Sequence, residues 1–309
     1  MEKKYNEKID KQIALDFAIR DKEGKYEAGY KIDGKPTYYN YMSKEAWTVF
    51  FNSMSEKHKA HYNDADGGEL KAKKGRYGLN PPKMASFGSS SRFLYVCSSN
   101  INDFIFEKKL PTRVGHDANL DGYLQKGDRD YFIEAKCREI YTSHKGQEIG
   151  IVYKKVYEDI HESNNDFCYH SVRNTDDDHF ICNFQYKKKD LVHFDIKQLI
   201  CHFLGITANL IENKKANTDI KFVYLILDPR MEKGKTDFSD DRIKKYEKSI
   251  RDEYLATIEE IKRFGDMKWL FDAVMKYQVE KLNSHRQDLK YKFEFTIASQ
   301  EDYRKALDL

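Results

Sequence analysis

The stretch that decides the fold is residues 118–137, which read ANLDGYLQKGDRDYFIEAKC. Its two ends are short apolar runs bounded by turn residues, a pattern typical of two β-strands. Gly127 and Asp128 lie between them and suit a two-residue hairpin turn of the kind that begins with glycine. Pairing outward from this turn places Asp121 directly opposite Glu134 on one face of the hairpin, with Cβ atoms ~5 Å apart.

Glu134 and Lys136 lie in an apolar strand, where charged side chains are unusual. Because side chains alternate along a strand, both are expected on the face that carries Asp121. Two carboxylates at this separation repel each other unless a cation lies between them. Carboxylate oxygens suit Mg²⁺, and Lys136 beside the ion would help to deprotonate or orient an attacking water.

A second interpretation stays open, namely an ordinary cluster of lysine and carboxylates on a solvated sheet face. The Glu-x-Lys spacing is uninformative by itself, because it also begins at other glutamates such as Glu69 and Glu107. What separates Glu134 from these is its apolar strand. The order of the surrounding elements then favours the metal site over the solvated cluster.

The segments on either side of the hairpin predict an α/β order. Ser89 and the two serines after it offer N-cap hydroxyls for a helix, and residues 104–110 read as a further strand. An apolar stripe predicts a helix over residues 196–213. A buried strand is expected over residues 222–227, so that the order is helix, three strands, helix, strand.

The remaining segments are less distinctive. Residues 1–80 read as charged and partly helical, and residues 138–192 as a variable polar stretch. Residues 240–282 are expected to be helical with a break at Gly265, and residues 290–297 alternate apolar and polar side chains as a late strand. No internal repeat or low-complexity tract divides the chain.

Four segments resemble a bacterial group of restriction endonucleases within the PD-(D/E)xK nuclease superfamily. They are MASFGSSSR at 84–92, FEKKLP at 106–111, ANLDGYL at 118–124 and FIEAKC at 132–137. The resemblance implies a restriction-endonuclease-like core, a mixed central sheet flanked by helices in the order αβββαβ. One departure is that no proline precedes Asp121, where this chain has Asn119 and Leu120.

The same resemblance implies a domain organisation. Residues 84–235 would form the nuclease-like core, and residues 1–83 a helical and loop extension packed on it. Residues 236–309 would add C-terminal helices and the late strand to the same domain.

By this resemblance Asp121 and Glu134 are metal ligands, Ala135 lends its backbone carbonyl to the metal, and Lys136 is the catalytic lysine. The implied cofactor is Mg²⁺, with Mn²⁺ able to substitute. Many members also carry a glutamate on the helix before the first strand, but residues 84–100 contain no acidic residue. Glu107 is the nearest substitute, although an ion pair with Lys108 or Lys109 explains it slightly better.

Gln198 is a further candidate, because members of an exonuclease-like branch carry a glutamine on the helix after the core strands. His202 lies one turn later on the same side of that helix. No charged residue occurs from Gln198 to Ile211, which suggests a helix that is covered on both sides or lines a cleft. Glu139 is a weaker candidate for supporting the metal shell.

Composition limits the alternatives. The chain has 309 residues and a net charge of +3, with 40% hydrophobic residues, enough for a folded core. The longest apolar run has only six residues, far short of the ~20 that cross a bilayer. Five cysteines without a CxxC pair indicate reduced thiols. We therefore expect a cytoplasmic protein without membrane association or a secretory signal.

These observations lead to one prediction and two alternatives. The prediction is a metal-dependent endonuclease that hydrolyses DNA, double-stranded and foreign in the case of a restriction enzyme, and that acts as a homodimer. The alternatives are a catalytically inactive nucleic-acid-binding module on the same fold, and an RNA or repair nuclease. A zinc site is also considered, at low odds because the spacing fits no familiar module; its four ligands would be Cys168, His170, His179 and Cys182.

Overall fold

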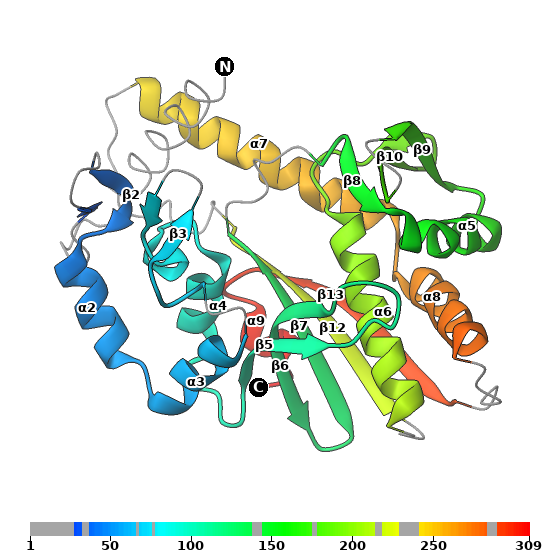
Figure 1. Ribbon diagram of the computed structural model, residues 1–309, viewed down its shortest axis with the longest axis horizontal. Coiled ribbons are helices and arrows are strands. Elements are labelled where there is room, and N and C mark those ends of the chain that lie inside the picture. Colours follow the sequence, from blue (N-terminus) through cyan, green and yellow to red (C-terminus); the bar gives the residue numbers. More distant parts are fainter. Residues whose placement is uncertain are drawn as a thin grey trace.

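The computed structural model describes residues 28–32, 37–65, 68–75, 78–137, 144–174, 178–213, 218–228, 241–282 and 289–309. A five-stranded sheet forms its centre, in the order β13–β12–β7–β6–β5 (Figure 1). Strands β5 (Ile105–Leu110), β6 (Ala118–Lys126) and β7 (Arg129–Lys136) are antiparallel neighbours. Strand β12 (Thr218–Ile226) runs parallel to β7, and β13 (Tyr291–Ala298) runs parallel to β12. The protein is therefore of the mixed α/β class, with an open sheet.

The α-helices are α2 (Lys44–Ser53), α3 (Glu56–Asp64), α4 (Ser90–Ser98), α5 (Lys154–Ser163), α6 (Ile196–Glu212), α7 (Asp241–Arg263), α8 (Lys268–Lys281) and α9 (Tyr303–Ala306). Two short 3-10 helices are η1 (Lys83–Ala85) and η3 (Ile151–Tyr153). The remaining strands are β1 (Ala28–Tyr30), β2 (Tyr38–Met42), β3 (Lys73–Gly75), β4 (Gly78–Asn80), β8 (Gln147–Gly150), β9 (Phe167–Asn174), β10 (His179–Tyr186) and β11 (Lys189–Asp190). Within the described ranges, no helix is long and apolar enough to cross a bilayer.

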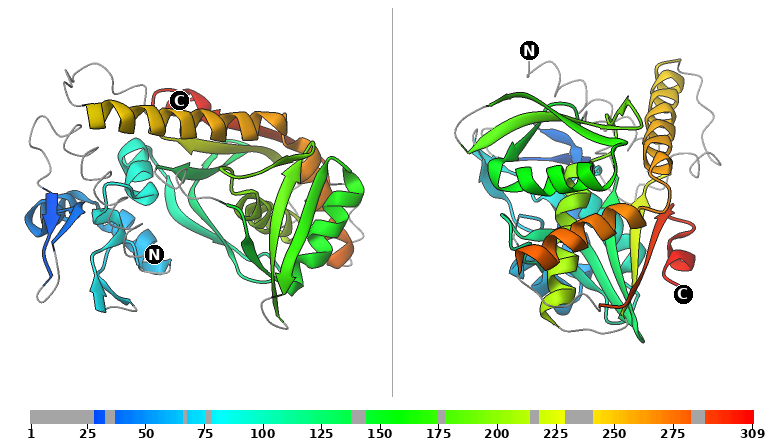
Figure 2. Two further views of the ribbon diagram at one scale, coloured as in Figure 1. Left: turned by 90° about the horizontal axis from the view of Figure 1, so that it is seen from above. Right: turned by 90° about the vertical axis from the view of Figure 1, so that its right-hand side faces the viewer.

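Helices cover both faces of the central sheet (Figures 1 and 2). Phe132 and Phe222 point to the face where α6, backed by α5 and α8, completes one hydrophobic core. Ile133 and Val223 point to the opposite face, where α4, α9 and the N-terminal helices complete a second core. Both faces of β7 are thus buried, which explains why its sequence reads as an almost continuous apolar run.

The predicted hairpin and its register are confirmed. Gly127 lies in the turn with φ of 59°, which glycine adopts without strain. The β6–β7 ladder pairs Gly122 with Ile133, the step directly before the predicted pair of Asp121 and Glu134. The predicted helix after Ser89 is also confirmed, since the Ser89 hydroxyl accepts a hydrogen bond from the Arg92 N–H and caps α4.

The prediction of a variable polar stretch over residues 138–192 was wrong for most of the segment. Its described residues form an antiparallel sheet, β11–β10–β8 with β9 on β10, that packs with α5. Along β10 the buried side chains alternate with more exposed ones, as expected for a half-buried strand. Polar residues on the open face of this strand obscured the alternation in the sequence.

Helix α6 lies unusually close to the central sheet. A Cβ atom added at Gly205 would lie 2.8 Å from Ala118 Cβ and 2.9 Å from Leu110 Cβ, so only glycine allows this approach. On the outer side, Gln278 of α8 donates hydrogen bonds to the carbonyls of Thr112 and Leu204. These contacts fix α6 against the strands that carry Asp121 and Glu134.

Candidate active site

The side chains of β6 switch from one face of the sheet to the other at Asp121. Leu120 packs into the core beneath α6, whereas a side chain at Gly122 would enter the opposite core. The β5–β6 ladder pairs the residues on either side but leaves out Glu107 and Asp121, and Glu107 has φ of 54°. A non-glycine residue in this conformation costs roughly 1–3 kcal/mol, and such strain occurs mainly at functional sites. Because of this irregularity, the side chains of Glu107 and Asp121 do not follow the regular alternation between the two faces of the sheet.

The Asp121 side chain reaches across to the backbone of β7. Its Oδ2 accepts a hydrogen bond of 2.7 Å from the Ala135 N–H. This bond holds the Asp121 carboxylate at the point where β6 and β7 separate. Glu134 and Lys136, the neighbours of Ala135, lie at the same point. The predicted role of the Ala135 carbonyl as a metal ligand stays a prediction.

Glu134, Lys136 and Gln198 form a compact polar cluster between β7 and α6. Lys136 Nζ lies 2.8 Å from Glu134 Oε1 and donates a 2.5 Å hydrogen bond to Gln198 Oε1. Only 3% of the Glu134 side chain and 10% of the Lys136 side chain are exposed. Strand alternation therefore predicted correctly that Glu134 and Lys136 share one face. Gln198, which the resemblance made a candidate, lies beside them. The alternative interpretation, a lysine–carboxylate cluster on a solvated sheet face, is wrong because the cluster is buried.

His202 approaches the same glutamate from the next turn of α6. Its Nε2 lies 2.9 Å from Glu134 Oε2, but the two groups are not oriented as a hydrogen bond. Both atoms are buried and have no hydrogen-bond partner among the described residues. Glu134 Oε2 thus lies in ion-pair contact with His202 inside a buried site, and a bound cation would replace this contact.

The position of Gln198 follows from the way α6 begins. Asp195 caps the helix by accepting a 3.0 Å hydrogen bond from the Gln198 N–H. The loop before Asp195 is held in turn by Glu260 of α7, whose carboxylate accepts bonds from three successive backbone N–H groups at residues 192–194. A buried acid on a distant helix therefore sets the register of α6 against β7.

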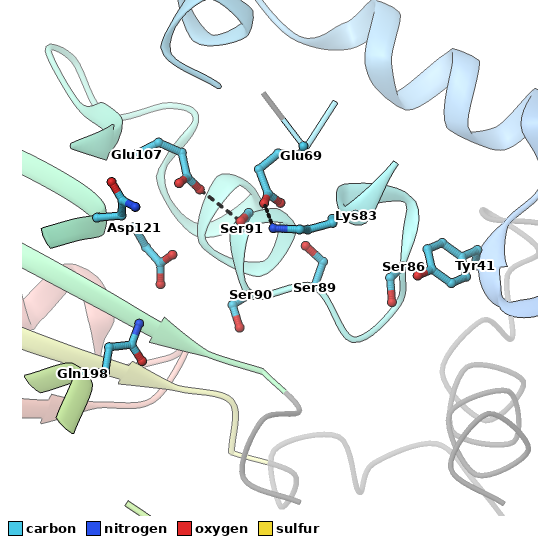
Figure 3. A pocket seen from close by; sticks show the side chains of 12 residues that line it. Tyr41, Glu69, Lys83, Ser86, Ser89, Ser90, Ser91, Glu107, Asp121 and Gln198 are labelled. Carbon is cyan, nitrogen blue, oxygen red and sulfur yellow. Dashed lines mark hydrogen bonds and ion pairs between the residues drawn. The ribbon is translucent and has the colours of Figure 1, made fainter. Parts of the chain in front are cut away.

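A pocket of about 410 Å³ opens next to this cluster (Figure 3). Asp121, Glu107 and Gln198 lie on one side of it, and Glu69 and Lys83 on another. The remaining lining residues are Tyr41, Gly68, Ser86, Ser89, Ser90, Ser91 and Asn119. Glu69 and Lys83 are 2.8 Å apart and form an ion pair. Serines at the start of α4 line the pocket between these groups, and Ser91 donates a 3.1 Å hydrogen bond to Glu107.

The carboxylates around the pocket raise one another's pKa. Burial raises the pKa of Asp121 well above its usual value, and the charges of Glu134 and Glu107 raise it further. Burial also raises the pKa of Glu107 to about 7, with a further contribution from Glu69. Negative charge therefore exceeds what the neighbouring cations neutralise, and such an environment stabilises a bound divalent cation.

Glu134 behaves differently from its neighbours. Burial acts to raise its pKa, but the Lys136 ammonium and the His202 imidazole outweigh burial and lower the pKa to about 2. Glu134 is therefore ionised at neutral pH, while Asp121 is the carboxyl group that most readily holds a proton. Of the two acids, Glu134 is therefore already ionised. A cation that binds Asp121 would displace the proton of its carboxyl group.

Glu107→Gln is expected to remove a pH dependence of stability. The pKa of Glu107 is raised in the folded state, so its stabilising effect is complete below the unfolded pKa and is lost as pH rises toward about 7. Between pH 5 and 8 the free energy of unfolding of the wild type should fall relative to the variant by roughly 1–2 kcal/mol, after allowance for solvent screening. Urea unfolding in EDTA across this range measures the difference, and parallel curves would contradict the prediction.

Sequence reasoning missed two charged residues of the pocket, Glu69 and Lys83. Both belong to the segment before α4, and no local pattern in the sequence connects them with the hairpin. The acidic residues that line this pocket are Asp121, Glu107 and Glu69, and Glu69 comes from the segment before α4. Glu139 lies outside the described residues.

The zinc interpretation finds no support. Cys182 is fully buried in a hydrophobic core, while His170 is exposed and within 3.0 Å of Gln185 Oε1. Across the part of the chain that the structure describes, no three His, Cys, Asp or Glu side chains are grouped closely enough to form a metal site by themselves. Spacing along the chain was a poor guide here because β9 and β10 spread these residues along the hairpin.

Taken together, the hairpin and α6 define a class of site: a buried carboxylate–lysine cluster at the place where two strands separate, beside an open polar pocket. Comparison with protein-family models, curated proteins and solved structures finds no match for this chain. The function has to be inferred from this site alone.

Proposed function

We propose that this protein is a Mg²⁺-dependent deoxyribonuclease with a restriction-endonuclease-like core, and that it acts as a restriction endonuclease on double-stranded DNA. The observation that carries the proposal is the convergence of Asp121, Glu134, Lys136 and Gln198 beside one pocket. The order α4, β5–β6–β7, α6, β12, with α5 and β8–β11 inserted between β7 and α6, supports the proposed core.

The donor set fits a hard divalent cation. Asp121 and Glu134 offer carboxylate oxygens, and Glu134 Oε2 is buried without a hydrogen-bond partner among the described residues. Mg²⁺ is usually held by one or two carboxylates together with waters and substrate phosphates, so the lack of a preformed three-residue cluster in the described ranges is compatible with it. A bound Mg²⁺ would supply Lewis acidity at the scissile phosphate.

The residues of the chain have separate tasks in this proposal. Glu134 and Gln198 hold the Lys136 ammonium close to the carboxylates, where it orients the attacking water and stabilises developing negative charge. The serines at the start of α4 line the pocket, and the N-terminal end of a helix suits phosphate oxygens. Because a palindromic site presents two equivalent scissile bonds, the proposal includes a homodimer.

One observation favours the alternative of an inactive nucleic-acid-binding module. Glu134 does not line the pocket, and its Oε1 is already paired with Lys136. A catalytic complex therefore requires the Glu134 head group to turn toward the substrate, whereas a binding module would keep the ion pair as it is.

A plasmid-nicking assay separates these functions. The wild type should nick supercoiled DNA in Mg²⁺ or Mn²⁺ and not in EDTA. Lys136→Ala should lose roughly a hundredfold or more of this activity, the usual size of a proton-transfer contribution. A gel shift in Ca²⁺ checks that the variant is folded and binds DNA. Binding without cleavage by the wild type would favour the inactive module, and cleavage of RNA alone would favour the ribonuclease.

A further inference from the structure

A second pocket of about 640 Å³ lies on the neighbouring side of α6. It is enclosed by α6, by η3 and the start of α5, and by the loop before β6. The lining residues are Gly115, His116, Glu148, Gly150, Ile151, Val152, Tyr153, Tyr157, Asp178, His179, Lys197 and Cys201. No role in the proposed cleavage reaction involves any of them.

The walls of this pocket are apolar and aromatic. Ile151 and Val152 remain 46% and 54% exposed, although most large apolar side chains of the described residues are buried. The Tyr153 hydroxyl oxygen accepts a 3.0 Å hydrogen bond from the His116 N–H in the loop before β6, and Tyr153 lines the cavity. Tyr157 is almost fully buried and lines the cavity. A phenolic hydroxyl in such a wall can donate a hydrogen bond to a polar group of a ligand or accept one from it.

The mouth of the pocket carries polar and charged groups. The residues with nitrogen-bearing side chains at the mouth are Lys197, His116 and His179. The acidic residues there are Glu148 and Asp178. Lys197 is fixed by a 2.7 Å hydrogen bond from its Nζ to the Glu148 carbonyl. An apolar aromatic cavity with a polar rim suits a flat heteroaromatic ring that carries polar groups on its edge.

The two pockets share one helix. Gln198 lines the first, while Lys197 and Cys201 line the second, one position before and three positions after it. At about 100° per residue these side chains leave α6 on adjacent sides. The two pockets therefore lie on adjacent sides of α6.

We propose that the second pocket binds a single nucleobase of the nucleic acid at the active site, turned out of its stack, with its ring against Tyr153 and a polar edge on the Tyr157 hydroxyl. The proposal rests on the proposed nuclease function for its choice of ligand. Removing a base from the stack costs a few kcal/mol, and stacking on an aromatic side chain together with burial offsets that cost.

Saturation-transfer NMR with the four deoxynucleoside 5′-monophosphates, in EDTA and with the full chain, tests the pocket. At least one nucleotide should receive saturation at its base protons. Val152→Glu should weaken its binding roughly tenfold or more, because the change places a charge in the apolar mouth. Tyr157→Phe, which keeps the ring, should weaken it roughly threefold to tenfold through the loss of one hydrogen bond.

Val172→Glu is the matched control. Val172 lies in β9, is 57% exposed and does not line the pocket, so this variant should bind as the wild type does. No saturation transfer to any nucleotide, or equal losses in the two valine variants, would overturn the proposal. The assay contains no metal and measures no cleavage. If the protein binds nucleotides but does not nick DNA, the base-binding proposal stands and the nuclease proposal fails. If it nicks DNA but binds no nucleotide, only the base-binding proposal fails.

Discussion

Asp121→Asn is expected to reduce Mg²⁺-dependent DNA cleavage by at least about a thousandfold while leaving the protein as stable as the wild type or more stable. The loss follows from the several kcal/mol that a metal contributes to charge stabilisation, since each 1.36 kcal/mol is a factor of ten in rate. Asparagine keeps an oxygen that can accept the hydrogen bond from the Ala135 N–H. The fold at the strand separation is thus preserved.

The stability half of this prediction follows from the charges around Asp121. Its pKa is raised by burial and by Glu134 and Glu107, so ionised Asp121 costs stability at neutral pH in the absence of metal. A neutral amide removes that cost, and we expect a gain of about 1 kcal/mol in the free energy of unfolding in EDTA. Mg²⁺ should raise the melting temperature of the wild type and not that of the variant, because only a protein that binds the ion is stabilised by it.

The measurements are plasmid nicking and thermal unfolding with and without Mg²⁺. Asp128→Asn is the control, because Asp128 lies exposed in the turn of the same hairpin and should change neither quantity. If Asp121→Asn cleaved DNA at the wild-type rate, Asp121 would not be a ligand. If it unfolded far more easily, the carboxylate would be a structural group and the repulsion described above would be absent.

The parts of the site that could be predicted are those fixed by local geometry. A two-residue turn at Gly127 sets the register of the hairpin, and this register brings Asp121 to the part of β7 that carries Glu134. The periodicity of α6 likewise placed Gln198 and His202 on one side. Both inferences depend on residues within a few positions of each other, where the backbone leaves little choice.

The parts that could not be predicted depend on tertiary packing. Glu69 reaches the pocket through a loop that precedes α4, and Glu260 fixes α6 from another helix. The positive φ of Glu107 could not be predicted from the sequence either, because no glycine occupies that position. In each case the deciding contact joins residues that are far apart in the sequence, and composition carries no information about it.

Removing one charge from the buried pair is expected to be the most destabilising change in the site. In EDTA at pH 7, Glu134→Gln should lower the free energy of unfolding by about 3–5 kcal/mol, because the Lys136 ammonium is left buried without its counter-ion. Relief of the repulsion on Asp121 offsets part of this loss. Glu158→Gln removes one partner of an exposed pair with Lys154 and should cost less than about 0.5 kcal/mol.

The double variant Glu134→Gln with Lys136→Met decides how the loss arises. Two neutral side chains leave no buried charge without a partner, so at least half of the lost stability should return. The pKa of Glu134 is lowered in the folded state, so its contribution is present above the unfolded pKa near 4.5 and is lost as pH falls toward about 2. The wild type should therefore lose its advantage over Glu134→Gln in acid. Urea unfolding at pH 7 and pH 3 measures both effects. Additive losses in the double variant would show that Glu134 and Lys136 do not depend on each other, and the proposed division of roles between them would then fail.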